Sequence, residues 1–346
     1  MIEQFKAQIR AGQALCIRGA GSKDFYGNPP QGEMLDTRAY SGIVAYEPTE
    51  LYVTAKCGTP LAEIEAALAA QGQCLAFEPP RFSAESTIGG VVAAGLSGPR
   101  RVSAGALRDF VLGVKLLDGA ARELNFGGQV MKNVAGYDVS RVIAGSLGTL
   151  GLITEVSLKV LPKPVADATL RFEMAQAAAL DKLNRWAGQP LPMVASAWEA
   201  GVLTIRLAGA RAAVEAAQQK VGVGGTADAG FWDTLRDQTT DFFNTETLWR
   251  LSVPSTAPEF KLPGEQLIEW GGALRWLKSD APPETIRAAA SAVGGSATLY
   301  RAPAELKAQV GAFAPLPPPL MALHKNLKAA FDPQGLFNPG RLYKDF

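Results

Sequence analysis

The spacing of apolar residues predicts alternating strands and helices in the first half of the chain. Apolar runs predict strands at 52–55, 110–117 and 150–161. Between the first two strands, apolar residues recur every three or four positions, with Thr59 as a helix cap before them and Gly72 after the last turn. We interpret this helix as part of the core, because its apolar positions share one face.

The second half has a different pattern, which predicts an antiparallel sheet covered by helices on one face. The expected strands are 168–172, 194–198, 202–207 and 297–300, and the expected helices are 176–186, 210–221 and 283–293. A last helix is predicted at 320–331. Four tryptophans of this half are interpreted mostly as core residues: Trp232, Trp249, Trp270 and Trp276.

Composition places a boundary near Pro162. All three cysteines precede this residue and all six tryptophans follow it. A chain of 346 residues is long for a single core, so two domains are expected. We expect a first domain at 1–163, a second at 164–319, and a C-terminal helix and tail at 320–346.

Charge and cysteine usage remove several classes of function. The formal net charge of +1 gives no reason to expect a nucleic-acid partner. Cys16, Cys57 and Cys74 lie far apart without a C-x-x-C pair, which argues against a disulfide framework and against a zinc or iron–sulfur site. We expect no metal, and thiols in a reducing compartment.

The sequence predicts neither a signal peptide nor a membrane-spanning segment. Residues 1–12 resemble a short amphipathic helix rather than a signal peptide, since Glu3, Lys6 and Arg10 interrupt the apolar positions. No run reaches the ~20 apolar residues that span a bilayer. We therefore expect a cytoplasmic protein, with any membrane association arising through partner subunits.

Three glycine-rich segments carry the candidate chemistry. Residues 16–23 form a short strand that enters a loop of small residues, where successive N–H groups would bind an anion such as a pyrophosphate. Residues 86–98 are rich in small side chains, as a wall against a flat ligand would be. Residues 145–151 contain four glycines and lead directly into the strand at 150–161. Together these segments predict a nucleotide-containing cofactor.

The dinucleotide fingerprint of the Rossmann fold does not fit these segments. After Gly19 and Gly21, Asp24 occupies the position of the third glycine, and no strong helix follows. The chain also lacks a Gly-Lys-Ser/Thr phosphate loop. The predicted nucleotide site therefore belongs to another fold.

The motifs resemble the vanillyl-alcohol-oxidase family of FAD-binding proteins, also called PCMH-type. Residues 18–22 resemble its pyrophosphate loop, 87–90 its second flavin loop, and 109–119 its paired strands. Lys132 and the 145–151 block resemble the branch that holds glycolate oxidase and D-lactate dehydrogenase subunits. Phe331-Asp332-Pro333 and the segment 336–341 resemble the closing motif of that branch.

This resemblance implies an α+β fold, with a two-subdomain FAD-binding domain and a smaller cap domain built on an antiparallel sheet. The C-terminal tail would return to the FAD-binding domain, with Arg341 tying it down. Ser22 stands beside the position where some members bond a histidine to the flavin, so non-covalent FAD is implied. The expected FAD contacts are Arg18, Gly19, Ala20, Gly21, Ser22, Lys23, Pro79, Ser86, Thr87, Gly89, Gly90, Gly95, Gly98, Lys132, Gly148 and Ile153.

The catalytic base is not identified by the sequence. Oxidation of a 2-hydroxy acid needs a base, usually histidine, and the single histidine of this chain is His324 on the last predicted helix. The alternative is a histidine that is packed in the fold. The larger catalytic relatives carry a histidine-rich substrate region that is absent here.

Three functions remain open. The first is an FAD-binding subunit of a glycolate oxidase complex, with a catalytic flavoprotein sister subunit and an iron–sulfur subunit that receives the electrons. The second is a stand-alone FAD-dependent hydroxy-acid or alcohol oxidase. The third is a flavin fold that serves as a scaffold for a catalytic sister subunit.

Overall fold

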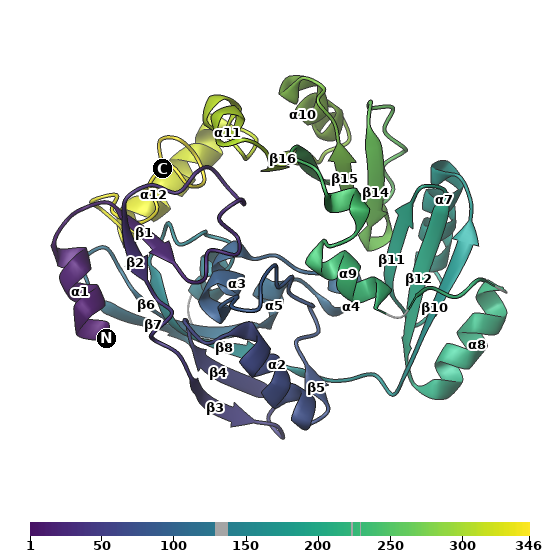
Figure 1. Cartoon of the computed structure of the whole chain (residues 1–346), viewed down its shortest axis with the longest axis horizontal. Coiled ribbons are helices and arrows are strands. Elements are labelled where there is room, and N and C mark those ends of the chain that lie inside the picture. Colours follow the sequence, from purple (N-terminus) through teal and green to yellow (C-terminus); the bar gives the residue numbers. More distant parts are fainter. Residues whose placement is uncertain (129–137, 223, 229) are drawn as a thin grey trace. The chain divides into compact units, whose positions relative to one another are not determined.

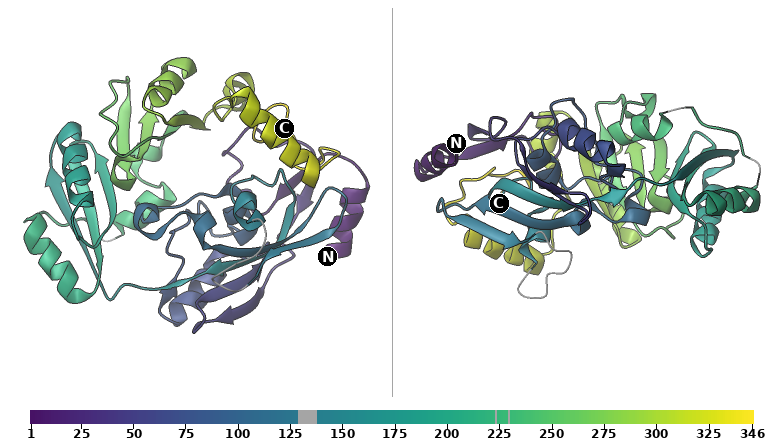
Figure 2. Two further views of the ribbon diagram at one scale, coloured as in Figure 1. Left: turned by 180° about the vertical axis from the view of Figure 1, so that it is seen from behind. Right: turned by 90° about the horizontal axis from the view of Figure 1, so that it is seen from below.

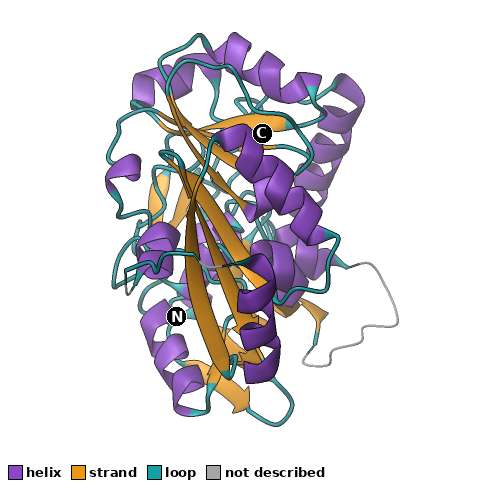
Figure 3. Ribbon diagram, turned by 90° about the vertical axis from the view of Figure 1, so that its right-hand side faces the viewer, coloured by secondary structure: helices purple, strands orange, loops and turns teal. Residues whose placement is uncertain are grey.

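The computed structural model describes residues 1–346 except 129–137, 223 and 229. Its internal contacts divide the chain into two compact units. Unit 1 comprises Met1–Ser97, Ala106–Pro162 and Ala304–Phe346. Unit 2 comprises Gly98–Gly105 and Lys163–Pro303. Helices and antiparallel sheets occur in both, so the fold belongs to the α+β class, as expected (Figure 3).

Unit 1 contains a five-stranded antiparallel sheet in the order β3-β4-β8-β6-β7. These strands are β3 (Ile43–Glu47), β4 (Tyr52–Lys56), β6 (Val111–Leu117), β7 (Glu123–Gly127) and β8 (Leu152–Lys159). A parallel pair joins β1 (Leu15–Arg18) to β2 (Glu33–Asp36), and a short pair joins β5 (Gln73–Cys74) to β9 (Leu161–Pro162). The predicted strands at 52–55, 110–117 and 150–161 are thus confirmed, with small shifts at their ends.

Unit 1 has helices between its strands and at both ends of the chain. They are α1 (Ile2–Arg10), α2 (Leu61–Ala70), α3 (Ile88–Ala94), α5 (Leu107–Phe110), α6 (Val139–Ile143), α11 (Ala304–Val310) and α12 (Pro318–Phe331). Leu61, Ile64 and Leu68 on α2 are buried, which confirms the core interpretation of that helix. The helix begins at Leu61 with Pro60 as its N-cap, so the prediction of Thr59 as the cap is wrong. The Thr59 hydroxyl instead donates to Lys56 O and Gly42 O.

The two ends of the chain share one core in unit 1. Phe5 and Ile9 of α1 pack with Leu15 of β1 and with Phe337 near the C-terminus. Leu15 also pairs with the tail, because its N–H donates to Leu336 O at 2.7 Å. In Figures 1 and 2 the yellow C-terminal segment accordingly lies beside the purple N-terminal strands. The tail therefore acts as an integral part of this core.

Unit 2 is built on a seven-stranded sheet in the order β10-β12-β11-β14-β15-β13-β16, in which every neighbouring pair is antiparallel. The strands are β10 (Ala166–Glu173), β11 (Met193–Glu199), β12 (Val202–Gly209), β13 (Leu248–Ser252), β14 (Glu265–Glu269), β15 (Leu274–Lys278) and β16 (Ser296–Arg301). The helices are α4 (Arg101–Ala104), α7 (Gln176–Ala187), α8 (Arg211–Val221), α9 (Phe231–Asp237) and α10 (Pro283–Ala292), with 3₁₀ turns at Asp241–Phe243 and Trp270–Gly272.

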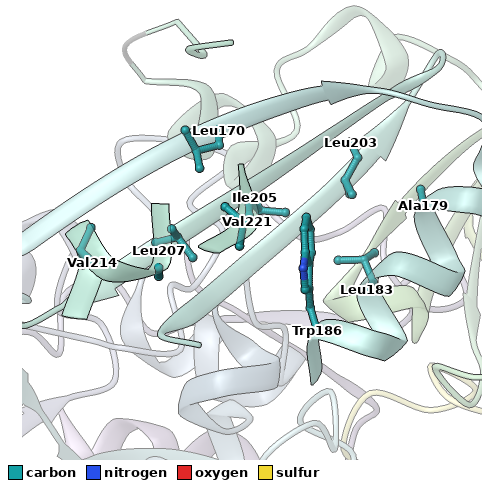
Figure 4. Close-up of a cluster of buried hydrophobic side chains, with 10 residues drawn as sticks. Leu170, Ala179, Leu183, Trp186, Leu203, Ile205, Leu207, Val214 and Val221 are labelled. Carbon is teal, nitrogen blue, oxygen red and sulfur yellow. The ribbon is translucent and has the colours of Figure 1, made fainter. Parts of the chain in front are cut away.

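Two helices of unit 2 cover the same face of its sheet. Leu203, Ile205 and Leu207 alternate along β12, so their side chains point to one face, where they meet α7 and α8 (Figure 4). Trp186 of α7 and Val221 of α8 join this cluster. The predicted antiparallel sheet and the two predicted helices on one face are therefore confirmed. Helix α9 lies on the other face, because Trp232 Nε1 donates to Thr169 Oγ1, and Thr169 pairs with Arg206 between Ile205 and Leu207. The four tryptophans interpreted as core residues, Trp232, Trp249, Trp270 and Trp276, are all buried.

A buried ion pair fixes the turn that follows α12. Lys328 and Asp332 lie one helical turn apart, with 2.7 Å between Nζ and Oδ2. The Lys328 ammonium also donates to Thr149 O and Phe337 O, and the Asp332 carboxylate accepts from the amides of Leu336 and Phe337. Burial lowers the pKa of Lys328, while its bond with Asp332 opposes that shift. The pair thus links the 145–151 block to the tail.

We expect Asp332→Ala to lower the free energy of unfolding by about 3–5 kcal/mol, because it leaves a buried ammonium without its counter-charge. Chemical denaturation followed by circular dichroism measures this. Asp181→Ala is the matched control, since Asp181 forms an ion pair of the same spacing with Arg185 on the surface. That change is expected to cost about 0.5 kcal/mol or less. Equal losses in the two variants would contradict the role assigned to the buried pair.

Candidate functional site

A pocket in unit 1 opens at the end of β1. Residues 16–24 form one side of it, in which the strand passes into the glycine loop. The other sides come from Thr87, Gly90, Ala93 and Ala94 around α3, and from Pro30, Leu147, Asn338 and Arg341. Of the expected FAD contacts, the pocket brings together Arg18, Gly19, Ala20, Gly21, Ser22, Lys23, Thr87 and Gly90.

The loop presents a row of backbone donors. Within the described part of the chain, the N–H groups of Gly19, Ala20, Gly21 and Ser22 donate to no protein acceptor. A buried or half-buried amide without a partner is costly, so such a row is typical of a site that receives an anionic ligand. The loop is anchored before this row by Arg18, whose carbonyl accepts from the amide of Thr37 at 3.0 Å.

Two glycines of the loop permit close contacts that a larger residue would block. A Cβ on Gly19 would lie 2.2 Å from Thr87 Oγ1, so the loop can approach the start of α3 only because this position is glycine. Gly21 has a φ of +72°, and a Cβ there would lie 2.2 Å from the Arg18 guanidinium. The guanidinium therefore lies directly over the loop, where it pairs with Asp24 at 2.6 Å.

Lys23 is held by two serine hydroxyl groups. Its Nζ donates to Ser86 Oγ at 2.6 Å and to Ser22 Oγ at 3.3 Å, and it lies 5.5 Å from the centre of the Phe82 ring. Ser86 is buried and does not line the pocket, so its role in this structure is to orient Lys23. The ammonium thus places a positive charge at the edge of the glycine loop.

Small residues on α3 and in the 145–151 block serve the packing around the pocket. Thr87 caps α3 by accepting from Gly90 N at 3.4 Å. Gly89 faces Cys57 instead of the pocket, because a Cβ there would lie 2.7 Å from Cys57 Cβ. Gly95 ends the helix in a left-handed conformation, and a Cβ there would lie 2.8 Å from Gly145.

Several expected contacts lie away from the pocket. Pro79 and Ile153 do not line it, and Ile153 is a buried core residue of β8. Gly148 lies next to the pocket, with Asn338 Nδ2 2.7 Å from the position of a Cβ. Gly98 belongs to unit 2, where its carbonyl accepts from Trp270 Nε1 at 3.0 Å. Lys132 lies outside the described residues.

The single histidine lies in an aromatic cluster. His324 of α12 is half-buried, with its ring centre 6.0 Å from that of Tyr343 and 6.2 Å from that of Phe346. It does not line the pocket. This position fits the packed alternative, in which the histidine holds the last residues of the chain against α12.

Sequence reasoning did not identify Asn338 and Arg341 as site residues, although both line the pocket. Burial lowers the pKa of the Arg341 guanidinium, while the nearby Asp24 carboxylate raises it. Both residues stand in the 336–341 motif, which was interpreted as a closing element. Its distance of more than 300 positions from the loop left no local signal of the contact.

Among the described residues, no group of three or more histidine, cysteine, aspartate and glutamate side chains could hold a metal ion. No helix formed by these residues is both long enough and apolar enough to cross a membrane. Burial raises the pKa of the Cys57 thiol to about 12, so this cysteine stays protonated at neutral pH.

Known proteins resemble this chain both in part and over its full length. Residues 5–127 match the family model of the FAD binding domain. The Bacillus subtilis glycolate oxidase subunit GlcD is 33% identical over 47% of this chain and 35% of its own length. The solved structure of an alkyldihydroxyacetonephosphate synthase superposes with a TM-score of 0.67 at 16% identity, covering 99% of this chain and 75% of that chain. This structural likeness shows the fold.

The full-length similarity is to a subunit of an oxidoreductase. The Escherichia coli K12 glycolate oxidase subunit GlcE is 49% identical over 347 aligned residues, which cover 100% of this chain and 97% of that protein. Together with the FAD binding domain match, this confirms the expected cofactor class and the expected family. The chain belongs to the family of the glycolate oxidase subunit GlcE.

Proposed function

We propose that this chain is the FAD-binding subunit of a glycolate oxidase complex and that the pocket beyond β1 holds the diphosphate of FAD. The observation that carries the proposal is the row of four free N–H groups at Gly19–Ser22. Three cationic side chains, Arg18, Lys23 and Arg341, line the same pocket. Backbone donors combined with cations suit a diphosphate, which carries two negative charges and several acceptor oxygens.

FAD would supply the two-electron oxidation of a 2-hydroxy acid such as glycolate. The residues of this chain would bind and orient it. Ser22 donates or accepts within the cluster of Ser86 and Lys23, and it offers no imidazole for a bond to the flavin. This supports non-covalent attachment.

The proposal also assigns glycolate oxidation and electron transfer to other subunits. His324 is packed against the C-terminal aromatic residues, which supports a packing role for it. We place the oxidation of glycolate to glyoxylate mainly in a catalytic flavoprotein sister subunit. The electrons would then pass to an iron–sulfur subunit, since the three cysteines of this chain form no cluster-binding motif.

The visible spectrum of the purified chain tests this assignment. We expect a flavin band that anaerobic glycolate leaves unchanged in the isolated chain and bleaches when the partner subunits are present. Bleaching in the isolated chain would replace the proposal with a self-sufficient oxidase. A chain that takes up no flavin, even when FAD is added, would leave only the scaffold function.

Gly21→Ala tests the pocket itself. The change adds a Cβ that strikes the Arg18 guanidinium at a residue with φ +72°, so both the loop and the cation must move. We expect FAD to bind at least roughly tenfold more weakly, a loss of about 1.4 kcal/mol. Flavin fluorescence titration of the flavin-free chain measures this change.

Gly72→Ala is the matched control for backbone strain. Gly72 has a similar φ of +65°, and a Cβ there would have no heavy atom within 4 Å. It follows α2 and does not line the pocket. We expect this variant to lose stability without a change in FAD affinity, and a comparable loss of affinity would count against the pocket.

A further inference from the structure

The C-terminal segment supplies a buried arginine to residues 23–28, which follow the glycine loop at 19–22. Arg341 is only 6% exposed. Its Nη1 donates to Asn28 O, and its Nη2 donates to Lys23 O at 3.2 Å and to Asp24 O at 3.0 Å. All three acceptors are backbone carbonyls between residues 23 and 28. One guanidinium thus fixes the backbone at both ends of this segment.

A second buried cation binds the middle of the same segment. Lys307 of α11 is 3% exposed, and its Nζ donates to Phe25 O and to Gly27 O, the latter at 3.2 Å. Asn28 completes the attachment, because its side-chain amide donates to Gly340 O at 2.8 Å and its Oδ1 accepts from Ala312 N. The carbonyls of residues 23–28 are therefore bound almost entirely by residues beyond 303.

Asn338 attaches β1, the strand that leads into the glycine loop. Its Oδ1 accepts from the amide of Ile17 at 2.7 Å, and its Nδ2 donates to Leu147 O at 2.6 Å. Its own amide donates to Leu15 O at 2.8 Å. One side chain thus holds β1 and the 145–151 block in a fixed relation, next to the pocket that both line.

These bonds determine where the free amides of the loop point. The row at Gly19–Ser22 lies between two anchors: the Arg18 carbonyl, which accepts from the amide of Thr37, and the segment 23–28, which Arg341 binds. A glycine-containing loop has many backbone conformations when it is not anchored. With both ends fixed, the four N–H groups are held together before any ligand arrives, which lowers the entropic cost of binding.

We propose that Arg341 is a positioning residue of the diphosphate site and that the site is complete only when the C-terminal segment 336–346 is docked on β1. This inference rests on the proposed FAD function. The segment of the FAD binding domain match ends at residue 127, yet the pocket needs residues 338 and 341. FAD binding and docking of the tail then stabilise each other to the same extent, because coupling between two binding equilibria is reciprocal.

The test uses the full-length chain, freed of flavin, with Arg341→Gln and Arg341→Lys. We expect Arg341→Gln to weaken FAD and ADP by the same factor, at least roughly tenfold, since ADP shares the diphosphate and lacks the flavin. Arg341→Lys keeps the charge and should recover part of the affinity for both ligands. FAD should also slow proteolytic removal of the last residues in the wild-type chain and lose this effect in Arg341→Gln.

Arg275→Gln is the matched control. Arg275 is a buried arginine of unit 2 that also binds three backbone carbonyls, those of Gly272, Pro258 and Ala257. Its replacement should reduce the stability of the chain and leave the affinities for FAD and ADP unchanged.

The outcomes separate this inference from the proposed function. A wild-type chain that binds neither FAD nor ADP would overturn the proposed function itself. If the wild-type chain binds FAD and Arg341→Gln binds it equally well, only the positioning role fails. The role also fails if Arg341→Lys recovers nothing, or if Arg275→Gln weakens FAD as much as Arg341→Gln does.

Discussion

The buried hydrogen bonds between the C-terminal segment and the first strand are the interactions on which unit 1 depends. Lys328 binds a backbone carbonyl of the 145–151 block, Asn338 joins that block to β1, and Arg341 binds carbonyls in the segment 23–28 that follows the glycine loop. A buried carbonyl or ammonium without a partner is costly, so these sets of groups need each other. The start, the middle and the end of the chain are consequently fixed at one place, where the pocket lies.

The charge of the groups that bind each buried cation decides whether that cation is neutralised. Arg341 lines the pocket and binds neutral carbonyls in the contacts described above, so part of its positive charge is available to a ligand at the loop. Lys328, by contrast, is matched by the Asp332 carboxylate. The C-terminal part of the chain thus contains two kinds of buried cation. Lys328 is neutralised by Asp332 and stabilises the turn after α12, whereas Arg341 lies beside the glycine loop. A dianionic diphosphate complements the second arrangement.

The sequence was sufficient for features that repeat at short range. The spacing of Leu61, Ile64 and Leu68 predicted a buried helix face, because burial imposes this period locally. The order of strands and helices in the second half predicted its antiparallel sheet. The glycine loop at 19–22 was predicted from its consecutive small residues, which follow a short strand directly. The pocket roles of Asn338 and Arg341 depend on contacts across more than 300 positions. The orientation of Gly89 toward Cys57 and the placement of Gly98 in unit 2 likewise follow from packing that no local pattern reports.

The composition of the pocket explains how a subunit of this family could keep a cofactor without keeping the substrate chemistry. In the proposed site, backbone amides at 19–22 and carbonyl-bound cations would recognise a diphosphate, and neither kind of group needs to transfer a proton. A base for a 2-hydroxy acid would be a separate requirement, and the one histidine of the chain is used to pack the C-terminal aromatic residues. The features proposed to bind FAD therefore place no demand on the residues that would oxidise glycolate, and a sister subunit could carry the latter alone.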